Sequence, residues 1–110
     1  MIRHIVLFSV RAPQDVEAVI EGLSLLTAIP HARKLEIARN AKTDPFGNEI
    51  DVIVYGEFED EAALAAYKSH PTYFESIRRV KPLRELRLAA HYDTRAATRR
   101  PVAGRADGGA

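Results

Sequence analysis

The sequence contains no cysteine, no tryptophan and a single methionine among its 110 residues. Without cysteine the chain has no disulfide framework, no thiolate metal site, no iron–sulfur cluster and no cysteine nucleophile. It also lacks a long apolar run. The segment Ile5-Val6-Leu7-Phe8 is flanked by Arg3 and Arg11, and is too short for a signal-peptide core or a membrane span. We therefore expect a cytoplasmic protein that does not associate with membranes.

An excess of charge of either sign is also missing, since the formal net charge is +1. Residues 1–93 carry 12 Lys and Arg against 14 Asp and Glu, a balance of −2, whereas residues 94–110 carry four Arg and one Asp. A near-neutral body does not provide the basic face that nucleic-acid binding requires. We therefore predict no nucleic-acid partner.

Four segments have the composition of β-strands, at residues 2–10, 33–39, 50–58 and 85–93. Helical spacing of apolar residues predicts one helix that follows Asp15 and ends before Pro30. It predicts a second helical stretch from Asp60 to Val80, interrupted at His70-Pro71. Asp15 and Asp60 are expected to cap helices, and Thr72 to Glu75 has the pattern of a capping box.

The order of these elements is β-α-β-β-α-β, which predicts an α+β, ferredoxin-like fold with antiparallel strands in the order 4-1-3-2. Two helical stretches cover one face of such a sheet, yet the first and third strands are apolar on both faces. The uncovered face is expected to carry Ile5, Leu7, Ile53, Tyr55, Leu88 and Tyr92. A second copy of this face is the simplest cover, so we predict a homodimer formed through the sheet.

The chain is expected to form one domain over residues 1–93, followed by a disordered basic tail over residues 94–110. The tail is rich in Arg, Ala, Thr, Gly and Pro and has no hydrophobic periodicity. Its removal is expected to leave the melting temperature nearly unchanged.

Candidate site residues lie on the sheet face that the helices cover. The start of the first strand and the end of the last are adjacent in the predicted sheet, which brings His4 close to His91. Small residues at Gly56 and Ala89 suggest open space beneath the helices. The side chains expected to line this space are Val6, Phe8, Val54, Arg87 and Ala89. The alternative is that the two histidines only cap one end of the sheet.

The second helical stretch adds Tyr67, His70 and Tyr73, which recur at three-residue spacing. Tyrosine and histidine transfer protons and polarise carbonyl groups. Alternatively, His70 belongs to a helix-stop signal and the tyrosines are packing residues. No histidine pair has the spacing of a helical metal site, and no glycine-rich phosphate loop, nucleophile elbow or dinucleotide motif is present. We predict no metal and no cofactor.

Three segments together resemble the stress-responsive A/B barrel (Dabb) family. They are the opening residues 1–8, the segment from Phe58 to Leu64 with Tyr67-Lys-Ser-His70-Pro71, and the final His91-Tyr92-Asp93. The resemblance covers residues 1–93. It implies a ferredoxin-like protomer that dimerises sheet to sheet into a barrel.

The resemblance implies less about activity. In a plant polyketide cyclase of this family, a tyrosine that matches Tyr67 acts with a histidine whose position is Tyr73 here. A second cleft histidine matches His4, and a third falls on Val52. His91 replaces an acidic residue. The cyclase reaction is therefore not transferred to this chain.

Three hypotheses follow for the function. In the first, the cleft binds a small apolar or aromatic carbonyl compound, with Tyr67 as hydrogen-bond donor and His4 or His91 as base. Any catalysis would be acid–base chemistry of the cyclase or isomerase type. In the second, the protein is a non-catalytic, stress-associated dimer whose side chains fill the cleft. In the third, it is related to cofactor-free monooxygenases. Cavity volume separates the first two hypotheses.

Overall fold

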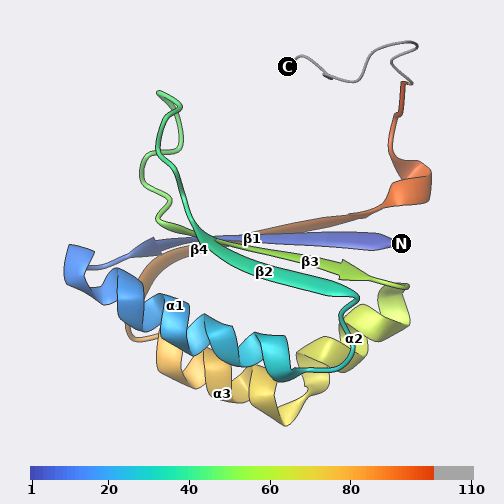
Figure 1. Cartoon of the computed structure of the whole chain (residues 1–110), viewed down its shortest axis with the longest axis horizontal. Coiled ribbons are helices and arrows are strands. Elements are labelled where there is room, and N and C mark those ends of the chain that lie inside the picture. Colours follow the sequence, from blue (N-terminus) through green and yellow to red (C-terminus); the bar gives the residue numbers. More distant parts are fainter. Residues whose placement is uncertain (101–110) are drawn as a thin grey trace.

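The computed structural model describes residues 1–100, which form one antiparallel sheet with helices on one side (Figure 1). The strands are β1 (Ile2–Val10), β2 (Lys34–Arg39), β3 (Val52–Phe58) and β4 (Arg84–Asp93). The helices are α1 (Val16–Ser24), α2 (Glu61–Ser69) and α3 (Pro71–Val80), with 3-10 turns η1 (Pro13–Asp15), η2 (Leu25–Ala28) and η3 (Thr94–Ala96). No helix within residues 1–100 is long and apolar enough to span a membrane.

The strands are arranged in the order β2-β3-β1-β4, and every neighbouring pair is antiparallel. This confirms the predicted ferredoxin-like topology. His4 is opposite Gly56 on β3 and opposite His91 on β4, so the expected alignment of the two histidines is present. Alternation of side chains then defines an inner face, which the helices cover, and an outer face.

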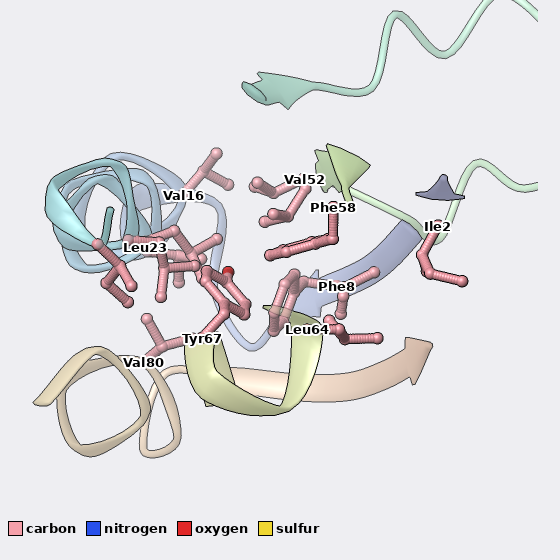
Figure 2. Packing of buried hydrophobic residues seen from close by; sticks show 14 residues of the cluster. Ile2, Phe8, Val16, Leu23, Val52, Phe58, Leu64, Tyr67 and Val80 are labelled. Atoms are coloured by element: carbon pink, nitrogen blue, oxygen red, sulfur yellow. The ribbon is translucent and has the colours of Figure 1, made fainter. Parts of the chain in front are cut away.

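The hydrophobic core lies between the inner face and the helices (Figure 2). Val52 and Phe58 of β3 are fully buried, as is Val19 of α1. The Phe58 ring packs edge-on against Tyr67 of α2, with 4.8 Å between the ring centroids. Side chains of the sheet and of the helices therefore meet in one core.

The helix-start predictions were partly wrong. Asp60 caps α2 as expected, accepting a hydrogen bond from the Ala63 N–H at 2.9 Å. Asp15 precedes α1 but makes no side-chain cap bond. The predicted capping box at Thr72 is also wrong, because α3 begins at Pro71 and His70 is its cap. Proline suits the first helical position, where its missing N–H costs nothing, and this moves the helix start ahead of Thr72.

After β4 the chain turns at η3. The Thr94 N–H donates to the Met1 carbonyl at 2.8 Å, and the Asp93 carboxylate lies 3.7 Å from the N-terminal ammonium. Residues 94–100 rise on the side of the sheet away from the helices, and so does the loop between β2 and β3 (Figure 1). The remainder of the predicted tail, residues 101–110, lies outside the described residues. The tail therefore stays a prediction.

Candidate functional site

A pocket of about 400 Å³ lies between the inner face of the sheet and the helices. Its base is apolar and is formed by side chains of β1, β3, α1, η2 and α3, namely Val6, Phe8, Val54, Leu23, Leu26 and Val80. Its remaining lining is polar or partly exposed, and includes His4, Tyr67, Lys68, Tyr73, Ser76, Ile77, Arg84 and Arg87. A mostly apolar cavity with a few converging polar groups is the usual form of a small-molecule site.

His4 is the polar group of the pocket with the least satisfied environment. Its side chain is 3% exposed, and its Nδ1 atom is buried without a hydrogen-bond partner. The ring lies 6.4 Å from Phe58 and 5.7 Å from His91, measured between centroids. Burial lowers the pKa of His4 to about 4, and the nearby charges of Lys68, His91 and Arg87 act in the same direction. At neutral pH, His4 is therefore an uncharged imidazole, and its lowered pKa makes it a weaker base than a free histidine.

Tyr67 faces this space from α2. It is 2% exposed and extends between Phe58 and Leu23 (Figure 2). Its ring also packs edge-on against Tyr73, with 5.2 Å between centroids. Burial raises the pKa of the Tyr67 hydroxyl, so this group stays protonated and serves as a hydrogen-bond donor. No side chain within residues 1–100 forms a hydrogen bond with it.

Basic side chains surround the partly exposed side of the pocket. Lys68 comes from α2, and Arg84 and Arg87 come from β4. Arg87 Nη2 donates weakly to the Tyr73 hydroxyl at 3.4 Å. No Asp or Glu is among the residues that line the pocket. The pocket therefore combines an apolar base with a positively charged rim.

A β-bulge brings Arg84 to this rim. In a regular strand, residues 84 and 87 point to opposite faces. The register between β1 and β4 shifts, so that Ser9 pairs with Leu86 but Val10 pairs with Arg84. This extra residue in β4 places Arg84 on the same face as Arg87. The sequence analysis did not include Arg84, because the strand predicted there began only at residue 85, whereas β4 begins at Arg84.

Three of the candidate residues lie outside the pocket. His70 caps α3, where its Nδ1 accepts a hydrogen bond from the Thr72 N–H at 3.1 Å. Ala89 and His91 face the helix side on β4, but both are exposed because the helices leave this edge strand uncovered there. His91 Nε2 lies 3.4 Å from the Glu61 carboxylate. His70 is thus held by a structural hydrogen bond, and His91 reaches the site only through its contact with His4.

The prediction that Gly56 leaves open space beneath the helices is wrong. A Cβ atom there would come within 2.8 Å of the Phe58 ring and 3.1 Å of Leu35. Gly56 is small because these side chains pack over it. The pocket lies instead beneath α3, where the sequence analysis also missed Leu23, Leu26, Ser76, Ile77 and Val80. Helical periodicity marks Leu23 and Leu26 as inward residues but does not show that space remains beside them.

The outer face of the sheet is the second candidate surface. Its central residues Ile5, Leu7, Ile53 and Tyr55 are only partly buried, and Leu88 and Tyr92 are 50% and 40% exposed. Arg3 Nε is buried there without a partner, while Arg3 Nη1 donates to the Tyr92 hydroxyl at 3.2 Å. Within residues 1–100, no three His, Asp or Glu side chains gather as a metal site requires.

Similar structures have the same fold. A dimeric ferredoxin-like protein of unknown function from Thermobifida fusca is 28% identical, with a TM-score of 0.71 over 83% of this chain and 88% of that one. A Dabb family protein with a ferredoxin-like fold from Mesorhizobium loti is 26% identical, with a TM-score of 0.70 over 84% and 94% of the two chains. An antibiotic biosynthesis monooxygenase is 13% identical, with a TM-score of 0.68 over 84% and 97%, a likeness that shows the fold alone.

No curated protein sequence matches the chain. The family model described as the stress responsive A/B barrel domain matches residues 2–94, which includes all four strands and the whole pocket lining. This match agrees with the resemblance carried by the first strand and the Tyr67-to-Pro71 segment. The chain therefore belongs to the stress responsive A/B barrel (Dabb) family.

Proposed function

We propose that the protein is a homodimer that binds a small apolar or aromatic carbonyl compound in the pocket of each subunit. The observation that carries this proposal is the unpartnered, almost fully buried Nδ1 of His4 beside an open apolar pocket. A buried polar atom without a hydrogen-bond partner lowers the stability of the folded protein, and such atoms are typical of functional sites. Tyr67 supplies a second buried polar group in the same lining.

The two groups have complementary chemistry. The protonated Tyr67 hydroxyl donates a hydrogen bond to the ligand's carbonyl oxygen, which makes the adjacent C–H more acidic. The neutral His4 imidazole accepts the proton that is released, and an enolate held by Tyr67 is the product of this step. Proton transfer to a positioned base typically contributes about 10²–10⁴-fold in rate. The reaction class is thus cofactor-free proton transfer next to a carbonyl.

The homodimer is proposed from the outer face of the sheet. This face presents partly exposed apolar side chains of three strands, including Leu7, Ile53 and Leu88. The related proteins from Thermobifida fusca and Bacteroides fragilis are described as dimeric. The helices cover only the other side of the sheet, and the loop between β2 and β3 and residues 94–100 rise on this side (Figure 1).

The alternative of a non-catalytic dimer requires a cleft filled by its own side chains. A pocket of about 400 Å³ favours ligand binding over that alternative. The likeness to a monooxygenase is confined to the fold, and no side chain of the pocket favours oxygen chemistry over proton transfer.

The proposed binding is tested with 2-acetylnaphthalene, an aromatic ketone, by fluorescence titration. The wild-type protein is expected to bind it, and Tyr67→Phe is expected to weaken binding by roughly 2- to 10-fold, the worth of one neutral hydrogen bond. Tyr92→Phe, on the outer face, is the matched control and is expected to leave the affinity unchanged. Failure of the wild type to bind the ketone, or equal affinity in Tyr67→Phe, contradicts the proposal.

A further inference from the structure

We infer that the pocket's ligand carries an oxyanion, a carboxylate or a phosphate, which Arg87, Arg84 and Lys68 receive at the rim. This inference rests on the proposed function and extends it to the class of ligand. Three cationic side chains line the pocket, and no acidic residue does. The imbalance is local, because residues 1–93 as a whole carry more acidic than basic side chains.

The rim cations differ from six of the nine other basic residues of the domain, the exceptions being Arg3, Arg11 and Lys81. Arg33, Lys34, Arg39, Lys42, Arg78 and Arg79 each lie within 4.0 Å of a carboxylate. Within residues 1–100, none of the three rim cations has such a partner, although all three are partly buried. A partly buried cation without a counter-charge is unfavourable beside an apolar surface, and an incoming anion removes that penalty.

The position of Arg84 strengthens the inference. The bulge in β4 places Arg84 on the inner face with Arg87, and both side chains line the pocket. Two arginines in the lining of one cavity suit an oxyanion, because each guanidinium can donate two parallel hydrogen bonds. The only hydrogen bond from Arg87 to a side chain within residues 1–100 is the long contact to Tyr73, which leaves its other donors available.

The arrangement also sets the shape of the ligand. The apolar base, with His4 and Tyr67 in its wall, receives the body and the carbonyl group, and the rim receives the anion. We therefore expect a compact molecule with a carbonyl at one end, an oxyanion at the other and an apolar or aromatic body between them.

The inference is tested with a matched pair of ligands, 6-acetyl-2-naphthoate and its neutral amide, 6-acetyl-2-naphthamide. The wild-type protein is expected to bind the acid about tenfold or more tightly than the amide at low salt, because a charged acceptor strengthens the hydrogen bonds. The corresponding naphthyl phosphate separates the two oxyanions. A preference for either anion over the amide supports the inference and identifies the group.

Substitutions at the rim test whether its cationic side chains cause the preference for the acid over the amide. Arg87→Gln and Lys68→Gln are each expected to lose most of the preference for the acid while binding the amide as the wild type does. Arg87→Lys keeps the charge and is expected to keep part of the preference. Lys81→Gln, which removes a lysine outside the pocket lining, is the matched control and is expected to change neither affinity.

The outcomes separate this inference from the proposed function. Binding of 2-acetylnaphthalene that depends on Tyr67, with no preference for acid over amide, overturns the anion inference and leaves the proposed function standing. A preference that persists in both Gln variants also overturns it, since the anion would then bind elsewhere. Failure of every naphthyl ligand to bind overturns both.

Discussion

The two faces of the sheet carry similar patterns of apolar side chains but differ in what covers them. On β1, the inner residues His4, Val6 and Phe8 are buried, whereas the outer residues Ile5 and Leu7 are only partly covered. The inner face is covered by helices of its own chain, while the outer face has no cover within residues 1–100 (Figure 1). Apolar alternation alone therefore does not indicate what covers a face.

Unsatisfied polar atoms occur on both faces. On the outer face, Tyr55 donates to Glu57 at 2.6 Å between oxygens, whereas Arg3 Nε is buried without a partner. On the inner face, His4 is unpaired at Nδ1. A buried, unsatisfied polar group is costly on either face, and the two groups differ in that His4 lines a pocket. Four predictions test the comparison of the two faces.

The largest effect is expected on the outer face from Leu7→Asp. In the proposed dimer the substitution buries an unpaired carboxylate in each subunit, which costs several kcal/mol per group and dissociates or unfolds the protein. Sedimentation velocity at micromolar concentration measures the outcome. Leu7→Met keeps the apolar volume and is the control that stays dimeric. A wild-type protein that sediments as a monomer refutes the proposed dimer.

The next effect concerns the inner face. Phe58→Ala removes a fully buried ring that packs on Tyr67 and covers Gly56, and we expect a loss of about 3–5 kcal/mol in the free energy of unfolding. Chemical denaturation at fixed protein concentration checks it, because dimerisation makes stability concentration-dependent. A loss below about 1 kcal/mol would show that this part of the core is loosely packed.

The third prediction is a pH dependence due to His4. Its pKa is about 4 in the folded protein and near 6.5 in the unfolded chain, so the unfolded chain binds the proton more readily. The stability contributed by neutral His4 is complete above about pH 6.5 and falls as the pH decreases toward 4. The total loss is on the order of 3 kcal/mol.

Unfolding free energies measured between pH 7 and pH 4 check this dependence. His4→Phe keeps a ring beside Phe58 and cannot be protonated, so its stability is expected to change less over the same range. Parallel pH profiles for the variant and the wild type would contradict the role assigned to His4. The acidic groups with lowered pKa, Asp51, Glu75 and Asp93, also contribute at the acidic end of this range, but they are common to both proteins.

The smallest effect is expected from Tyr67→Phe without ligand. Removing a buried hydroxyl that has no protein partner is expected to change stability by less than about 1 kcal/mol and to raise it if anything. Tyr92→Phe is expected to lower stability by a few tenths of a kcal/mol, since it removes only the exposed bond to Arg3. Thermal melts of both variants measure the difference. A large destabilisation by Tyr67→Phe would identify the hydroxyl as structural, against the proposed function.

Local signals in the sequence were sufficient for the fold. Apolar alternation in residues 2–10 and 50–58, helical spacing after Asp15 and Asp60, and the stops at Pro30 and Pro71 predicted the elements, their order and the alignment of His4 with His91. Alternation also placed Val6, Phe8, Val54 and Arg87 on the face where the pocket lies. The elements, their order and the face of each side chain depend on side-chain periodicity and on chain connectivity, and the sequence determines both directly.

The tertiary structure alone decided where the space lies and which charges surround it. Gly56 suggested a cavity that the Phe58 ring fills, because side-chain rotamers determine packing and the sequence does not show them. Arg84 joins Arg87 only through a bulge, which shifts the register by one residue and reverses the face that alternation assigns. Lys68 likewise became a rim residue because elements distant in the chain form the pocket together. The cap by His70 is instead a local contact, since its Nδ1 accepts from the Thr72 N–H two residues on.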